Sequence, residues 1–211
     1  MIVFGFGFIV NAQTNYTGRY GYSKNYPELP KDETGPFGTL IFLKTDYSQY
    51  KFWLFVSIGY PSYNSGELEG NLKIQNDSAV YIAEGNSCRI VFHFRKNGIL
   101  IQQNEGYWSD FGINVFVRGN YPKINSKIPT AKDIVRYSAR SMDLFVVSSK
   151  KAIIYKDEKT SEAKDQHFIK GDLVYASDDS QEVIFTKFIT KSGIYVEGWL
   201  KKSDLKWQSF Y

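Results

Sequence analysis

The sequence has little of the chemistry that most enzymes and metal proteins require. Its 211 residues include one cysteine, Cys88, and two histidines, His93 and His167. A single cysteine excludes an internal disulfide, and two separated histidines without a cysteine cluster do not make a metal-ligand set. Neither a glycine-rich phosphate loop in a folded segment nor a nucleophile-elbow motif is present. We therefore expect a non-enzymatic protein with no catalytic residue, no metal and no cofactor.

Charge of one sign and long apolar runs are also lacking. The chain has 26 Lys and Arg against 22 Asp and Glu, a net charge of +4, without a basic or acidic tail. Nucleic-acid-binding proteins usually concentrate basic charge, so nucleic acid is not an expected partner. The apolar run Met1–Val10 is too short to span a bilayer, and we expect no integral membrane segment in the mature chain.

The opening segment indicates export. Met1–Val10 is apolar throughout and Asn11-Ala12-Gln13 follows, which is the pattern of a secretory signal with its cleavage site. No Lys or Arg precedes the run, and a start codon placed too far downstream would explain that. A buried first strand is the alternative, although Gly5 and Gly7 suit a core strand poorly. We expect residues 1–12 to be a signal peptide and the mature protein to be bacterial, soluble, and periplasmic or secreted.

Aromatic residues are abundant, at 17% of the chain, and they favour half-buried strands. From Tyr16 to Tyr121 short apolar segments alternate with turn residues, and no helical stretch separates them. This pattern predicts an all-β, antiparallel meander or barrel of seven to eight strands. Asn97-Gly98 predicts a type I′ hairpin turn with positive φ at both positions. The expected strands are Thr39–Thr45, Tyr50–Gly59, Glu67–Gln75, Ala79–Glu84, Arg89–Arg95, Ile99–Asn104 and Phe111–Arg118.

Alternation along these strands predicts which side chains face the core. Ile90, Phe92 and Phe94 form one face of their strand. One face of Tyr50–Gly59 is formed by Phe52, Leu54, Val56 and Ile58. The opposite face of that second strand carries two further aromatic residues. They pack under another element or form an exposed binding patch, and the sequence favours packing. These residues are Trp53 and Phe55.

A few polar residues are candidates for chemistry. Glu67 and Glu69 share a strand face, where they are either a solvated surface or a catalytic carboxylate pair. Cys88 begins an apolar strand, which favours a buried, inert thiol over a reactive one. His93 is expected at a surface or edge.

The chain divides into two expected domains. Residues 13–123 form the antiparallel barrel, residues 124–142 a connector with helical spacing in Thr130–Tyr137, and residues 143–211 a second, smaller domain. The second domain contains three characteristic segments, and together they resemble a bacterial SH3 (SH3b) domain. These segments are Ala152–Tyr155, Phe168–Val174 and Gly198–Leu205.

This resemblance implies a small SH3-like barrel that exported proteins use to hold envelope material. Glycine and aspartate in Lys170-Gly171-Asp172 suit a tight turn. Many relatives have a tryptophan after Asp178-Asp179-Ser180, where this chain has Phe185 instead. Aromatic side chains offer flat contact area, so the expected ligand-binding residues are Tyr155, Tyr175, Phe185, Tyr195 and Trp199. For Trp199, a place in the core is an equal alternative.

The first domain resembles small exported β-barrel domains of Gram-negative bacteria and secreted lysozyme-inhibitor-like domains. Such inhibitors usually pair a cysteine at the Cys88 position with one in the loop Gly106–Asp110, which has none here. The residues that carry this resemblance are Gly18–Tyr20, Gly66–Gly70, Ala79–Tyr81, Cys88–Phe92 and Gly119–Tyr121.

Two functions follow from these resemblances. In the first, the SH3b unit binds cell-wall peptide or glycan, or an envelope protein. In the second, the first barrel inhibits an envelope-directed hydrolase through its loops Tyr60–Ser65 and Glu105–Asp110, and the SH3b unit localises it. A hydrolase with an unrecognised site is the least favoured possibility.

Overall fold

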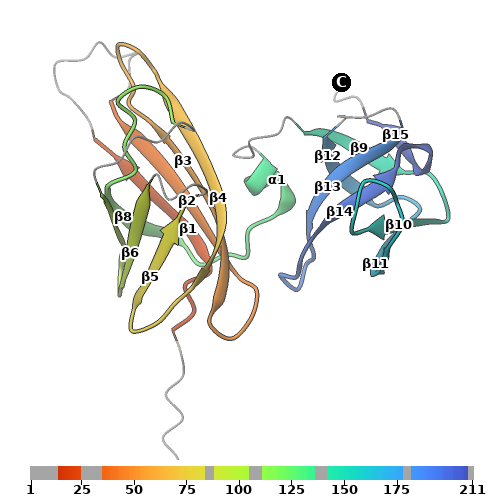
Figure 1. Cartoon of the computed structure of the whole chain (residues 1–211), viewed down its shortest axis with the longest axis horizontal. Coiled ribbons are helices and arrows are strands. Elements are labelled where there is room, and N and C mark those ends of the chain that lie inside the picture. The colour runs from red at the N-terminus through yellow and green to blue at the C-terminus, as the bar shows by residue number, and fades with distance from the viewer. Residues whose placement is uncertain are drawn as a thin grey trace, which may run out of the picture.

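The computed structural model of the chain contains two antiparallel β units with a short helix between them (Figure 1). It describes residues 14–24, 35–83, 88–104, 111–135, 142–177 and 182–208. The expected signal peptide and the loop Glu105–Asp110 lie outside these residues. The predicted all-β class, with an eight-stranded first unit and a smaller second one, is confirmed. Within the described part of the chain, no helix combines the length and apolar character needed to cross a membrane.

The first unit is a nearly closed meander of eight strands in the order β4-β3-β2-β1-β8-β7-β6-β5. Strands β1 to β4 pair antiparallel in sequence order, as do β5 to β8, and β1 also pairs with β8, which brings the two halves together. The ladder is interrupted between β4 and β5. The strands are β1 (Gly18–Ser23), β2 (Phe37–Lys44), β3 (Gln49–Ser57), β4 (Ser65–Lys73), β5 (Ser78–Ile82), β6 (Arg89–Arg95), β7 (Gly98–Gln103) and β8 (Gly119–Asn125).

Aromatic side chains fill the interior of this barrel. Phe42 lies at the centre, and its ring contacts those of five neighbours. The predicted inward faces of β3 and β6 are confirmed, because Phe52, Leu54 and Phe92 are fully buried. Burial of each such side chain contributes about 1.5–3 kcal/mol. The neighbours of Phe42 are Tyr20, Tyr50, Phe52, Phe92 and Phe94.

The prediction of a type I′ turn at Asn97-Gly98 is wrong. The β6–β7 hairpin exists, but Gly98 pairs with Arg95 as the first residue of β7, and its φ is not positive. Glycine is needed there because a Cβ would lie 2.5 Å from the backbone oxygen of Tyr121 in β8. The turn with two positive φ values is Asn76–Asp77, at 48° and 55°, between β4 and β5. Asn and Asp tolerate that conformation better than most residues.

The expected strand Phe111–Arg118 was also wrong. Only Phe111 makes a ladder contact there, with Gly66, and Asn114 turns the chain at φ 64°. Val115 and Val117 are buried at alternate positions, which imitates the period of a strand without its pairing. The amide of Val117 donates instead to the side-chain oxygen of Gln103, at 2.9 Å. The eighth strand is β8, and β1 was not among the expected strands.

The second unit is a seven-stranded sheet in the order β11-β10-β14-β13-β12-β9-β15. The expected turn at Gly171 is present, with φ 96° at the glycine and a hydrogen bond from the Ile169 amide to the Asp172 carboxylate at 2.9 Å. The short 3-10 helix η2 (Lys202–Asp204) precedes the last strand, which pairs with the first. The strands are β9 (Asp143–Val147), β10 (Lys151–Tyr155), β11 (Ala163–Ile169), β12 (Leu173–Ser177), β13 (Val183–Ile189), β14 (Tyr195–Lys201) and β15 (Leu205–Trp207).

The connector places a helix between the units. Helix α1 (Ala131–Val135) begins after Thr130, whose amide and hydroxyl both donate to the Asp133 carboxylate, at 2.8 and 2.7 Å. This cap fixes the first turn. Ile134 is fully buried in an apolar cluster to which both units contribute. We call this junction the seam; its apolar cluster is Ile41, Leu43, Trp53, Ile134 and Ile189.

Candidate ligand-binding face of the second unit

The five aromatic residues expected to bind ligand lie on one face of the second sheet. Side chains alternate along β14, and Val196 and Leu200 enter the core. Tyr195, Glu197 and Trp199 therefore point to the other side. Strand register extends this face, because residues directly opposite one another share a side of the sheet. Trp199 is opposite Tyr155 on β10 and Phe185 on β13, and Tyr175 on β12 is opposite Lys187 on β13.

Three of the five form a continuous aromatic row across β10, β14 and β13. The rings of Trp199 and Phe185 meet edge to face with centroids 5.3 Å apart. Tyr155 continues the row, and the Lys201 ammonium lies 5.8 Å from its ring centroid. Trp199 is half-buried and outside the core cluster of this unit. The structure therefore decides against a core position for Trp199.

A pocket of about 450 Å³ borders this row. Val183 and Lys201 pair across β13 and β14, two residues beyond Phe185 and Trp199, so the pocket continues the same face. The volume lies within the usual range for small-molecule sites. One carboxylate and two ammonium groups around it offer partners for both an amine and a carboxylate of a ligand. The lining residues are Thr160, Glu182, Val183, Lys201, Lys202 and Ser203.

Tyr195 and Tyr175 are separate from the row. Tyr195 lies at the far end of β14, where its ring packs against that of Trp53 in the first unit, with the ring centroids 5.5 Å apart. Its hydroxyl donates to Glu197 at 2.5 Å, and burial together with that carboxylate raises its pKa strongly. Tyr175 is half-buried on β12, beside Lys187 in the register. The part of the face away from the first unit therefore has three of the expected aromatics close together, each of them half-buried.

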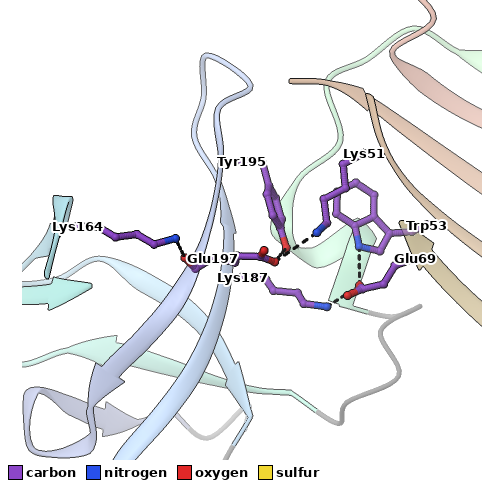
Figure 2. Close-up of polar contacts among 7 residues, drawn as sticks. All are labelled: Lys51, Trp53, Glu69, Lys164, Lys187, Tyr195 and Glu197. Atoms are coloured by element: carbon purple, nitrogen blue, oxygen red, sulfur yellow. Dashed lines mark hydrogen bonds and ion pairs between the residues drawn. The ribbon is translucent and has the colours of Figure 1, made fainter. Parts of the chain in front are cut away.

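Charged side chains cross the seam in two pairs (Figure 2). Lys51 of the first unit lies 3.3 Å from Glu197 of the second, and Lys187 of the second lies 2.5 Å from Glu69 of the first. Trp53 also donates its indole N–H to Glu69, at 3.1 Å. Burial alone would raise the pKa of Glu197, but the hydrogen bond from Tyr195 and the charge of Lys51 hold it below its usual value.

The seam settles two alternatives left open by the sequence. Trp53 is fully buried under the second unit, so packing is the correct interpretation for it, and Phe55 is half-buried against Phe37. The Glu69 carboxylate accepts from Lys187 and from the indole N–H of Trp53, so this side chain takes part in the seam. Burial raises the pKa of its strand neighbour Glu67.

The remaining candidates lie apart from this face. His93 shares a 2.9 Å hydrogen bond with Gln102 on the first barrel, and His167 is exposed on β11. Among the described residues, no group of His, Cys, Asp and Glu is arranged to hold a metal ion. Cys88 is buried as predicted, and burial raises the pKa of its thiol.

Sequence reasoning missed the two seam lysines. Each is a single lysine among apolar neighbours in a strand: Lys51 lies between Tyr50 and Phe52, and Lys187 precedes Phe188. Lysines are rarely buried unless they are paired. A lysine at such a position was therefore an available signal for a charged contact, although not for its partner.

Comparison with known proteins assigns the chain to no family. No family model matches the sequence, and no curated protein matches it. Among solved structures, the crystal structure of the Cpx pathway activator NlpE from Escherichia coli aligns with 91% of this chain and 95% of its own. The identity is 11% and the TM-score 0.27. A similarity at this level carries no argument about function.

Proposed function

We propose that the protein is a non-enzymatic, exported binding protein of the bacterial envelope. Its second unit is an SH3b domain that binds peptide or glycan of the cell wall. The aromatic row Tyr155–Trp199–Phe185 beside the charged pocket is the observation that carries this proposal.

The geometry suits a ligand with flat faces and both signs of charge. Half-buried aromatic rings contribute contact area at a low cost in side-chain entropy. Lys201 and Lys202 suit carboxylates, and Glu182 suits an ammonium group. Stem peptides of the cell wall carry both kinds of group next to a sugar chain. The strand order, with a 3-10 helix before a last strand that pairs with the first, supports the SH3b assignment.

The test is retention of the full chain on purified cell-wall sacculi. We expect Trp199→Ala to reduce retention at least tenfold while the circular dichroism spectrum stays unchanged. Trp207→Ala is the matched control, because Trp207 is exposed on β15, away from the aromatic row. Full retention by a folded Trp199→Ala variant would refute the wall-binding face. If the wild-type chain itself is not retained on sacculi, an envelope protein becomes the partner to seek.

A second function is favoured by one feature of the first unit. The loop between β3 and β4 exposes Tyr60 and Tyr63, whose rings lie 6.5 Å apart, and Tyr63 adopts φ 53°. Non-glycine residues rarely adopt that conformation, and here it accompanies two exposed aromatic side chains in one loop. Inhibition of a lysozyme-type hydrolase by the full chain, lost in Tyr63→Ala, would support this alternative.

A further inference from the structure

The seam buries two lysines that need the other unit. Lys51 and Lys187 are 7% and 3% exposed, and each reaches a carboxylate across the seam. A buried ammonium group is costly unless it is paired. These two side chains therefore favour one docked arrangement of the units, in which Lys51 meets Glu197 and Lys187 meets Glu69 (Figure 2).

The seam also covers one end of the candidate ligand-binding face. Tyr195, Glu197 and Trp199 follow one another at every second position of β14, on the same side of the sheet. Trp199 belongs to the aromatic row away from the seam, whereas Tyr195 packs against Trp53 and Glu197 pairs with Lys51. The face is therefore continuous along the strand, and the first unit occupies its Tyr195 end.

The chemistry of the seam favours one docked arrangement of the two units without binding them tightly. Its apolar part is small, with Trp53, Ile134 and Ile189 at its centre. Buried ion pairs give little net stability after their desolvation cost, but an arrangement that removes one partner leaves a buried, uncompensated lysine. Interfaces between domains of one chain generally resemble transient protein–protein interfaces. The connector from β8 to β9 joins the two units covalently, independently of the seam contacts.

We propose that docking of the first unit on the second is an autoinhibitory contact, which restricts the ligand-binding face to its Tyr155–Trp199–Phe185 end. Release exposes Tyr195, Lys187 and Glu197 and lengthens the face along the same strands. The ligand that gains affinity is a longer wall fragment, which can extend from the pocket beyond the aromatic row. This inference rests on the wall-binding function proposed above.

Charge reversal tests the proposal in the full chain. Lys51→Glu places two carboxylates opposite each other and opens the seam. The double variant Lys51→Glu/Glu197→Lys restores an ion pair of reversed direction and is the matched control. Glu69→Lys, with its own control Glu69→Lys/Lys187→Glu, repeats the test on the second pair in case Lys51→Glu fails to fold.

Two measurements are made on each variant. The radius of gyration from small-angle X-ray scattering and acrylamide quenching of tryptophan fluorescence report whether the seam is open, because Trp53 is fully buried when it is closed. Retention on sacculi reports binding. We expect the single variants to be retained about fivefold more strongly than the wild type, as one added aromatic contact implies. The double variants should return to the wild-type value.

The outcomes separate the two proposals. An open seam with wild-type retention overturns autoinhibition and leaves wall binding intact. A seam that stays closed in both folded single variants also overturns it, because the ion pairs then do not control docking. An open seam without retention of any chain, wild type included, refutes the wall-binding function and the inference with it. If the variants with an open seam are retained and the wild type is not, both wall binding and autoinhibition are supported.

Discussion

Gly198 allows strand β10 to approach β14 next to the aromatic row. A Cβ on Gly198 would lie 2.6 Å from the backbone oxygen of Tyr155 and 2.6 Å from Cγ2 of Ile154, and its φ is 156°. Real Cβ atoms are essentially never found closer than 3.0 Å to such atoms. A backbone oxygen cannot rotate away as a flexible side chain can, so Gly198→Ala has to displace β10.

We expect Gly198→Ala to lower the free energy of unfolding by about 3 kcal/mol. Overpacking of this kind costs about 1–3 kcal/mol, and a side chain in an unfavourable backbone region adds about 1 kcal/mol. Gly171→Ala is the matched control. Gly171 has φ 96° with no atom within 4 Å of the added Cβ, so only the backbone term of about 1 kcal/mol applies.

The assay is urea unfolding of both variants, followed by circular dichroism and fitted for the midpoint and slope. Because Tyr155 and Trp199 are paired at this point, Gly198→Ala should also weaken retention on sacculi, whereas Gly171→Ala should not. Equal losses of stability in the two variants would refute the reasoning, since they would show that β10 does not approach Gly198 as closely as described.

Three further predictions concern buried groups. Burial and the hydrogen bond to Asp77 raise the pKa of Tyr16 from 10.0 to about 12. The neutral form of Tyr16 is favoured in the folded chain, so its contribution to the free energy of unfolding should be complete below pH 10 and should be lost as the pH rises from about 10 through 12. Urea unfolding midpoints that do not change over this pH range would contradict this. The thiol of Cys88 should react with a thiol reagent only upon unfolding, because it is buried and its pKa is raised, and fast labelling of the native chain would argue against this. Ile134→Ala should cost about 3 kcal/mol as a fully buried seam residue, whereas the same change at the exposed Ile113 should cost less than about 0.5 kcal/mol, as measured by urea unfolding.

Much of the fold could be predicted because its signals are local. Alternation of apolar and polar residues in Arg89–Arg95 specifies a strand and its inward face, and the structure agrees at Phe92. Gly171 followed by Asp172 specifies its turn for a similar reason, since both residues act within a few positions of each other. Where a signal depended on distant partners, prediction failed. Gly98 is a glycine because β8 passes close by, and Val115 and Val117 are buried at alternate positions without the pairing of a strand.

The sequence by itself therefore determined the all-β class, the inward faces of β3 and β6, and which aromatic residues of the second unit to consider. Only the tertiary structure decided which of those aromatics lie in the aromatic row and which lie in the seam. Strand register placed Trp199 between Tyr155 and Phe185, while docking of the first unit placed Tyr195 beside Trp53. It also paired Lys51 with Glu197, residues 146 positions apart in the chain. Periodicity indicates on which side of a strand a residue lies, but contact between two different sheets depends on pairs of side chains far apart in the sequence, which no local pattern relates.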